Sequence, residues 1–333
     1  MPAPLSLIAT LCVAACLAAL ALTALARRYA LARQLVDAPG ERRSHTVATP
    51  RGGGIAIVAV VLPAMIWLGI AGKSLSPVFL SGACGLALVA AIGWLDDHRP
   101  LSPWGRLAVH LLAAALLAVG VAWAGQPAWW AIVVMVLALG LINVWNFMDG
   151  INGLAATQMI LVALGFLLLG LVGEGAILTC IVAAACAGFL PFNFPTARIF
   201  LGDVGSGALG LLAACLIAFA PAPDPIVSLP WLLPLSAFLI DAALTLLSRI
   251  IRGERWWTPH VQHVYQRCVQ AGHSHAVVTG GYAAWTLLSI LVAISIAGAP
   301  QPVIIGAFAT WYLLGVTIWL SFRIRHTRRM RLS

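Results

Sequence analysis

Charged residues are scarce in this sequence, and their scarcity excludes one class of protein. Asp, Glu, Lys and Arg make up 9% of the 333 residues, whereas about a quarter of an ordinary soluble domain is charged. Hydrophobic residues make up 62%, and the mean hydropathy is +1.00. The composition excludes an ordinary soluble domain and indicates a protein embedded in lipid.

Lysine is nearly absent, and the cysteines do not have the spacing of metal ligands. Lys73 is the single lysine, against eighteen arginines, and the net charge is +9. Six cysteines lie in apolar runs, where we expect them to be small packing residues: Cys12, Cys16, Cys84, Cys180, Cys186 and Cys215. Cys268 lies in a loop segment. The absence of ligand spacing makes a zinc site an unfavourable interpretation.

Charge-poor stretches of about 20 residues recur along the whole chain, each long enough to cross a hydrocarbon core of about 30 Å as a helix. We predict eleven spans, at residues 5–26, 53–72, 77–95, 104–124, 128–145, 154–172, 175–193, 205–221, 228–250, 277–299 and 302–322. The first lacks a basic segment before its apolar run, so we expect a retained span rather than a signal peptide. The expected fold is an all-α, polytopic membrane protein with one domain, residues 1–333.

The arginines predict the orientation. If the spans alternate, six segments share one side: 27–52, 96–103, 146–153, 194–204, 251–276 and the tail 323–333. All eighteen arginines lie in or against these segments, and Lys73 lies on the other side. This asymmetry predicts an outside N-terminus and a cytoplasmic C-terminus. It also explains the basic charge without a nucleic-acid partner, and we interpret the tail as an anchor for anionic lipid headgroups.

Four of the ten carboxylates lie at three junctions on the predicted cytoplasmic side: Asp96 and Asp97, Asp149, and Asp203. Converging carboxylates repel unless a cation or a proton compensates, and oxygen ligands suit Mg²⁺ shared with phosphates. The pattern favours metal-assisted phosphoryl transfer, although each acid alone is equally consistent with a helix cap. Asp241 lies inside a predicted span, so it is either a structural partner across helices or a functional group.

Basic and glycine-containing segments on the same side suit phosphate. The segment 252–275, RGERWWTPHVQHVYQRCVQAGHSH, combines Arg, His and aromatic residues; its Arg and His side chains could clamp a diphosphate or sugar, while Trp256 and Trp257 are equally consistent with interfacial anchors. The stretches PRGGG and GDVGSG could bring backbone amides to phosphate or serve only helix packing.

The ordered motifs DAPGERRSHTVATPRGGG, LDD, NFMDGING, NFPTARIFLGDVGSG and the histidine-containing loop resemble those of the polyprenyl-phosphate N-acetylhexosamine-1-phosphate transferases (glycosyltransferase family 4 type). The resemblance covers about residues 37–276. It implies ten or eleven spans, a cytoplasmic active site and dependence on Mg²⁺, with Mn²⁺ as the alternative ion.

The resemblance also implies roles for individual residues. Asp96 and Asp97 match the paired catalytic acids, and Asp203, together with Asp149, is expected to hold the metal. The expected substrate-binding residues are Asn146, Asp149, Asn193, Arg106, His263, His45, Arg43 and Arg252. Asn152, Tyr265 and Gln266 depart from the common family pattern, and this departure resembles the branch that initiates O-antigen synthesis.

The expected function is transfer of N-acetylhexosamine-1-phosphate from a UDP-sugar to undecaprenyl phosphate. The products would be undecaprenyl diphosphate-sugar and UMP, at the first membrane step of O-antigen or cell-envelope polysaccharide synthesis. The expected location is the bacterial inner membrane. The sequence is compatible with a homodimer but leaves the oligomeric state open. Two alternatives remain: a secondary transporter using an intramembrane acid such as Asp241, and a non-catalytic binder of the lipid carrier.

Overall fold

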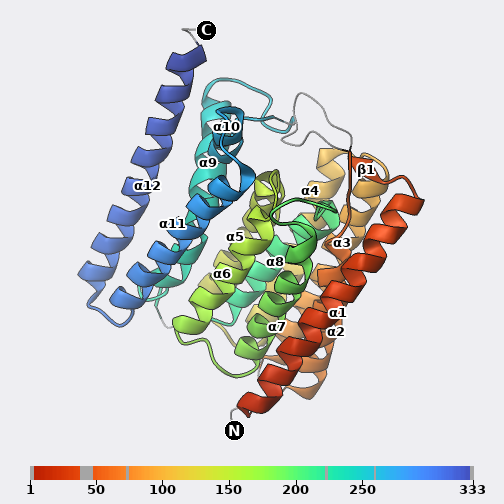
Figure 1. Ribbon diagram of the computed structural model, residues 1–333. Helices are drawn as coiled ribbons and strands as arrows, with labels where there is room; N and C mark the ends of the chain where they lie inside the picture. Colours follow the sequence, from red (N-terminus) through yellow and green to blue (C-terminus); the bar gives the residue numbers. More distant parts are fainter. Residues whose placement is uncertain (1–3, 38–47, 73–74, 222–223, 259, 331–333) are drawn as a thin grey trace.

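The computed structural model describes residues 4–37, 48–72, 75–221, 224–258 and 260–330 as a bundle of apolar helices (Figure 1). The α-helices are α1 Leu5–Ala32, α2 Ile55–Ala71, α3 Ser76–His98, α4 Pro103–Trp123, α5 Ala128–Met148, α6 Leu154–Leu168, α7 Gly173–Phe189, α8 Asp203–Ala218, α9 Ser236–Ile251, α10 Val264–Gln270, α11 His275–Ile296 and α12 Gln301–Met330. Two 3₁₀ helices complete the order: η1 Leu190–Phe192 lies between α7 and α8, and η2 Leu229–Leu235 directly precedes α9.

Each of the eleven predicted spans contains a helix. Within the described residues, eight helical segments are long and apolar enough to cross a membrane. The other three, α2, α6 and α8, have 17, 15 and 16 residues, which at about 1.5 Å per residue is shorter than a hydrocarbon core of about 30 Å. The all-α polytopic architecture is thus confirmed, whereas eleven crossings and their orientation stay predictions.

α8 is the central helix of the bundle. Every residue from Val204 to Ala218 is buried, and α8 packs against both α3 and α5. Glycine allows this closeness: a Cβ at Gly210 would lie 2.2 Å from the Leu141 backbone oxygen on α5. A helix that is apolar on all sides belongs in a core, and its first residue, Asp203, is thereby fixed at one end of the bundle.

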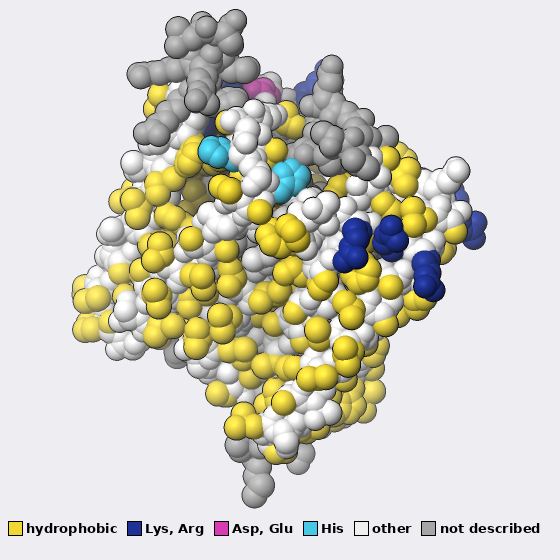
Figure 2. All heavy atoms as spheres, viewed as in Figure 1, with side chains coloured by type: hydrophobic (Ala, Val, Ile, Leu, Met, Phe, Trp, Pro, Cys, Tyr) yellow, Lys and Arg dark blue, Asp and Glu magenta, His cyan; other side chains and the backbone are white. Residues whose placement is uncertain are grey.

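The two ends of the bundle differ. The N-terminus and the C-terminus lie at opposite ends, and α10 lies at the end that carries the C-terminus (Figure 1). Figure 2 shows hydrophobic side chains over the middle of this face, with the coloured charged and histidine side chains gathered toward that same end. The distribution is that of a bundle whose middle faces lipid and whose polar groups face a water boundary.

The structure adds two features to the predicted all-α fold. β1 (Val36–Asp37) pairs antiparallel with β2 (Thr49–Pro50) as a two-residue ladder. The segment between α9 and α11 contains the short helix α10. The PRGGG amides serve the fold, because Gly53 N donates to Phe200 O at 2.9 Å and Gly54 N donates to Leu201 O at 2.8 Å.

Candidate active site

The junctions between helices bring most of the described predicted site residues to one cavity. Asp96 ends α3, Arg106 lies in the first turn of α4, Asn146 in the last turn of α5, and Asp203 begins α8. These residues and Asp149, which follows α5, line a cavity of about 560 Å³ at the end that carries α10. The cavity therefore gathers acids, an amide and a guanidinium from four helix ends.

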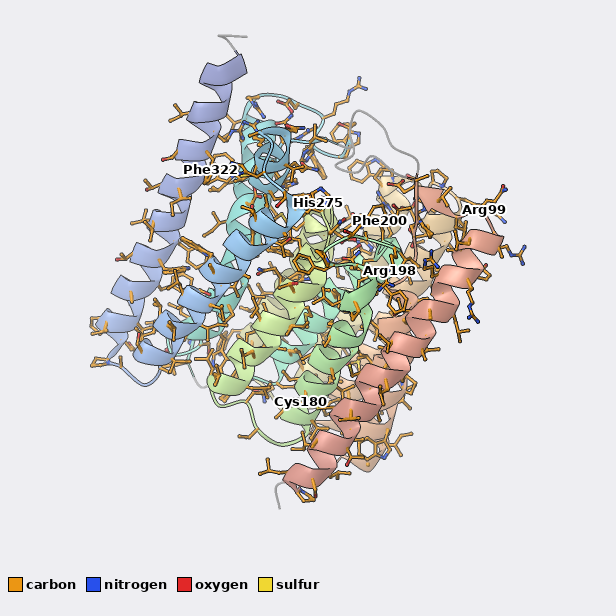
Figure 3. All side chains as sticks on the ribbon, in the orientation of Figure 1. Arg99, Cys180, Arg198, Phe200, His275 and Phe322 are labelled. Carbon is orange, nitrogen blue, oxygen red and sulfur yellow. The ribbon has the colours of Figure 1, made fainter. Side chains whose placement is uncertain are left out.

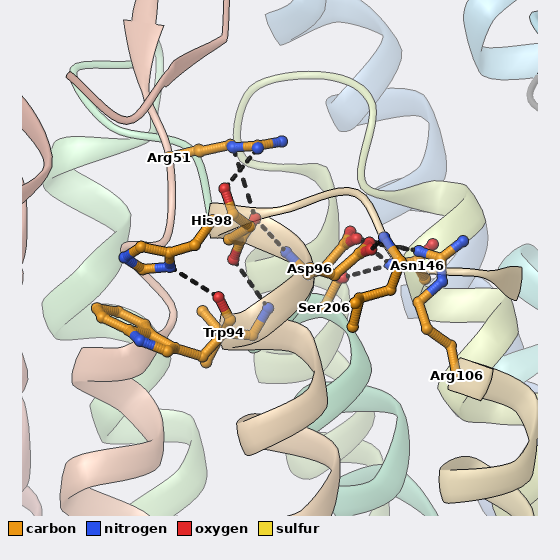
Figure 4. A network of polar contacts seen from close by, with 11 residues as sticks. Arg51, Trp94, Asp96, His98, Arg106, Asn146 and Ser206 are labelled. Carbon is orange, nitrogen blue, oxygen red and sulfur yellow. Dashed lines mark hydrogen bonds and ion pairs between the residues drawn. The ribbon is translucent and has the colours of Figure 1, made fainter. Parts of the chain in front are cut away.

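Arg106 joins two of the acids. Its Nη1 donates to Asp96 Oδ2 at 2.7 Å and to Asp203 Oδ2 at 3.1 Å (Figure 4). Asp96 Oδ1 also accepts a hydrogen bond from the Leu101 amide at 2.6 Å. A single cation thus compensates two carboxylates that lie 107 residues apart in the sequence, and it faces the cavity with them.

Asp97 has a different environment from Asp96. Its side chain is 3% exposed, and its two carboxylate oxygens accept hydrogen bonds from the Asp203 and Val204 amides, each at 3.2 Å. Arg51 Nε lies 3.9 Å from the same carboxylate. The described residues that line the cavity include Asp96 but not Asp97, so Asp97 fixes the start of α8, where an acid also suits the positive end of the helix dipole.

Asn146 and Asp149 sit on either side of the turn that ends α5. Asn146 Nδ2 donates to Asp203 Oδ1 at 2.8 Å and to Ser206 Oγ at 3.0 Å. Among the described residues, no group donates a hydrogen bond to the Asp149 carboxylate. Burial raises the pKa of Asp149 well above its usual value, and the charges of Asp203 and Asp97 add to the effect. An acid in this setting is either protonated or paired with a cation.

Oxygen ligands, rather than a complete metal cage, are what the cavity offers. The described side chains contain no group of three or more His, Cys, Asp or Glu residues placed to hold a metal ion. Mg²⁺ commonly takes only one or two carboxylates and completes its shell with water and substrate phosphates. Asp203 and Asp149 fit that mode, because both line the cavity and Asp149 lacks a donor among the described residues.

The segment between α9 and α11 forms the opposite wall. Trp256, Trp257, His260, His263 and Tyr265 all line the cavity. His263 is 2% exposed and Tyr265 donates its hydroxyl to Phe147 O at 2.9 Å. Burial, with the charges of His263 and Arg249, lowers the pKa of His260 to about 4. His260 is therefore neutral at physiological pH and adds a polar surface rather than a charge.

Asp241 holds this wall in place from inside the bundle. Its carboxylate accepts hydrogen bonds from the Val264 amide at 2.9 and 3.0 Å and from the Tyr282 hydroxyl at 2.6 Å. Thr245 Oγ1 donates to it at 3.2 Å, and His263 Nδ1 lies 3.6 Å away. Of the two roles left open for Asp241, the structure shows the structural one, a contact that joins α9, α10 and α11.

The remaining predicted residues lie apart from the cavity lining. Asn193 is 5% exposed and connects two segments, because its Oδ1 accepts from Gly153 N at 2.7 Å and its Nδ2 donates to Ile199 O at 3.0 Å. Arg252 donates to Gln262 Oε1 at 2.6 Å and pairs with Glu254 at 2.9 Å outside the described lining. Arg43 and His45 lie outside the described residues.

Sequence reasoning missed several residues of the site. Arg51, Trp104 and Ser206 were not among the candidates, yet Arg51 and Trp104 line the cavity and Ser206 bonds Asn146. Tyr265 had been noted only as a departure from a family pattern. Arg51 and Ser206 could have been found from the motifs that contain them, PRGGG and GDVGSG. No local motif marks Trp104, whose ring centre lies 5.9 Å from that of Trp256.

The fold and the cavity define a polytopic membrane protein with an acidic site at one end of its bundle. Residues 79–220 match the sequence profile of glycosyl transferase family 4. Over 284 residues the chain is 32% identical to decaprenyl-phosphate N-acetylglucosaminephosphotransferase of Mycolicibacterium smegmatis, and 30% identical to its namesake in Mycobacterium tuberculosis; each alignment covers 71% of this chain and 69% of the relative.

A third relative extends the comparison. The probable undecaprenyl-phosphate N-acetylglucosaminyl 1-phosphate transferase of Bacillus subtilis is 26% identical over 284 residues, covering 78% of this chain and 76% of that protein. The chain belongs to glycosyl transferase family 4, which confirms the resemblance drawn from its motifs.

Proposed function

We propose that this protein transfers N-acetylhexosamine-1-phosphate from a UDP-sugar to undecaprenyl phosphate, releasing UMP. The observation that carries the proposal is the convergence of Asp96, Asp149 and Asp203 with Arg106 and Asn146 in one cavity. Its support from the family is that the relatives are named for phosphotransfer of N-acetylglucosamine with decaprenyl or undecaprenyl phosphate.

The reaction makes one bond and breaks one bond. An oxygen of the lipid phosphate attacks the β-phosphorus of the UDP-sugar, and the bond from that phosphorus to the bridging oxygen breaks, so UMP leaves with the bridging oxygen. A phosphate nucleophile with a second pKa of about 6 needs little deprotonation near neutral pH. Positioning and charge neutralisation are therefore the main tasks of the protein.

The side chains divide these tasks. Arg106 presents its guanidinium to the cavity while Asp96 and Asp203 hold it, so it can neutralise charge on the diphosphate. Asn146 orients Asp203, and Asp97 anchors the amides that begin α8. Because His260 is neutral at physiological pH, arginine rather than this histidine supplies the positive charge from the protein.

Asp203 and Asp149 would hold Mg²⁺, with Mn²⁺ as the alternative. The ion supplies neutralisation of phosphate charge at the diphosphate. The proposal also places the site on the cytoplasmic side of a bacterial inner membrane, as the arginine distribution predicts. The biological setting would be the first membrane step of cell-envelope polysaccharide synthesis, with O-antigen favoured by Asn152, Tyr265 and Gln266.

The transporter alternative loses its main support. It rested on eleven spans and on an intramembrane acid such as Asp241, but this carboxylate accepts hydrogen bonds from Val264, Thr245 and Tyr282. The acids that line the large cavity lie at helix ends instead. Both findings favour an enzyme over a carrier with a site at the bilayer midplane.

One assay tests the proposal. Purified protein in lipid nanodiscs is given undecaprenyl phosphate, Mg²⁺ and each of several UDP-N-acetylhexosamines, and the lipid and nucleotide products are weighed. We expect the lipid to gain a sugar together with one phosphate, and UMP to appear in equal amount. Release of UDP would indicate transfer of the bare sugar, and no turnover with any donor would favour a non-catalytic lipid binder.

A further inference from the structure

A second cavity, of about 360 Å³, lies on the far side of α10 from the candidate active site. α9, α10, α11 and α12 enclose it, and its described lining shares no residue with that of the first cavity. Consecutive residues separate the two, because His263 lines the first cavity and Val264 lines the second. Its walls include Ile240, Cys268, Gly281, Tyr282, Trp319 and Phe322.

The second cavity opens toward lipid. Val277 and Phe322, which border it, are 62% and 45% exposed. Gly281 is exposed too, and a Cβ added there would meet no atom within 4 Å. An empty apolar hollow forfeits dispersion contacts along its walls, whereas an acyl chain from the surrounding bilayer would restore them.

Arginines stand at the end of this cavity nearest the polar end of the bundle. Phe322 on α12 lies toward that end (Figure 3), and the next residue, Arg323, places its guanidinium carbon 4.7 Å from the centre of the Trp319 ring in the cavity wall. The charge of Arg267 acts on Arg323, so the two guanidinium groups lie near each other, and Arg267 Nε donates to Gln262 O at 3.1 Å. Burial lowers the pKa of Arg267, and the nearby charge of Arg252 contributes. Glu254 pairs with Arg252, and the Asp241 carboxylate, which also lines the second cavity, accepts hydrogen bonds from the Val264 amide and the Tyr282 hydroxyl.

We propose that this cavity binds an anionic phospholipid, with one acyl chain against Trp319, Phe322 and Gly281 and the headgroup phosphate on Arg267 and Arg323. Guanidinium groups suit phosphate oxygens, and the apolar cavity suits the chain. Polyprenyl phosphate is the less suitable occupant, because its phosphate would then lie on the α12 side of α10, away from Asp96 and Asp203.

The bound lipid would support α10. Val264 and Cys268 line the second cavity, whereas His263 and Tyr265 line the first cavity. A chain filling the second cavity therefore packs against the back of the wall that borders the candidate active site. The binding itself does not depend on the proposed transferase activity, so the two can fail separately.

Gly280 and Gly281, two adjacent glycines of α11, provide a matched test. Gly281→Leu would fill the cavity, because Gly281 lines it and has open space at its Cβ position. Gly280→Leu is the control, since its Cβ also has open space but Gly280 lies outside the described lining. Both variants are reconstituted in nanodiscs of equal phosphatidylglycerol and phosphatidylcholine, and the lipids retained on the protein are measured by native mass spectrometry.

We expect the wild type and Gly280→Leu to retain phosphatidylglycerol preferentially and Gly281→Leu to lose it. Equal retention by all three would overturn the proposal, as would displacement of the lipid by equimolar undecaprenyl phosphate. Arg267→Gln and Arg323→Gln keep the cavity and should each weaken the preference for the anionic lipid about fivefold, the effect of one basic residue near a membrane surface. Arg28→Gln on α1 should leave it unchanged, and an unchanged preference in both cavity-side variants would refute the headgroup assignment.

Discussion

The Asp97 carboxylate accepts a hydrogen bond from the backbone amide of Asp203 at 3.2 Å, so one acid of the Asp96-Asp97 pair anchors the helix that begins at Asp203. The second oxygen binds the Val204 amide at the same distance. Asp96 instead lines the cavity and holds Arg106. Neighbours in sequence thus have separate tasks, one in the support of α8 and one at the cavity surface.

Asp97→Ala should lower the free energy of unfolding by about 1 kcal/mol, the usual cost of losing a side chain that accepts from helix N-terminal amides. Asp97→Asn is the control, because its side-chain oxygen can still accept from one of these two backbone amides. Thermal unfolding in detergent measures both. Equal destabilisation by Asn and Ala would mean that the charge, through Arg51 or the helix dipole, matters more than the hydrogen bonds.

Asp203→Asn should abolish Mg²⁺-dependent release of UMP while the protein still inserts into the membrane. The amide lacks the charge to bind the ion, although its one oxygen can still accept from either Arg106 or Asn146, which donate to different oxygens of the carboxylate. We expect a loss of about 100-fold or more, the scale of removing one group that stabilises transition-state charge. Membrane fractionation controls for insertion, and full activity in this variant would refute the metal assignment.

Arg106→Gln should reduce transfer by about 100-fold, since it removes the cation that faces Asp96, Asp203 and the diphosphate. Arg106→Lys should retain part of the activity, because it keeps the charge but lacks the other guanidinium N–H groups that remain beside the Nη1 bonded to both carboxylates. Initial rates of UMP release compare the two. If lysine and glutamine are equally inactive, the geometry of the guanidinium rather than its charge is what the site requires.

Asp241→Ala should destabilise the segment around α10, because the buried Val264 amide and Tyr282 hydroxyl lose their acceptor at a cost of about 1–3 kcal/mol for each unsatisfied group. Tyr282→Phe removes only one donor and leaves the carboxylate bonded to the Val264 amide, so its effect should be smaller. Hydrogen exchange of the α10 amides reads out the difference. Unchanged protection in Asp241→Ala would contradict the anchoring role.

His260→Gln tests a pH effect of known sign. Burial lowers the pKa of His260 to about 4 in the folded protein, against about 6.5 in an unfolded chain. Above about pH 6.5 His260 is neutral in both states and does not change the free energy of unfolding. As the pH falls from about 6.5 toward about 4, the unfolded chain binds a proton that the folded protein does not, so the free energy of unfolding falls. Over that window the wild type should lose more stability than His260→Gln. Parallel unfolding curves for the two proteins would show that His260 titrates normally.

The helices were predictable because their apolar runs are local in sequence, and each of the eleven contains a helix. α10 was not, since its seven residues, VYQRCVQ, carry too little periodicity to be recognised. The convergence of Asp96, Asp149 and Asp203 on one side followed from alternating spans. The bridge by Arg106 did not, because it depends on how α3, α4 and α8 pack.

The assignment of roles within the site had similar bounds. The sequence alone does not distinguish the roles of Asp96 and Asp97. Successive side chains of a helix point about 100° apart, so Asp96 lines the cavity while Asp97 lies behind it. Substrate binding by Asn193 stays a prediction, and the structure shows that its side chain bonds Gly153 and Ile199. A role in orienting the turn after Asp149 is the reading that these contacts support.

The burial of α8 along its whole length isolates Asp203 from the mechanical state of the membrane. A change in bilayer thickness or lateral pressure acts first on helices that touch lipid, such as α1 and α12, and these can tilt to match it. α8 has protein on every side, so such adjustments reach Asp203 only through its neighbours. Because Asp203 begins a helix buried inside the bundle, its position should stay the same in membranes of differing lipid composition.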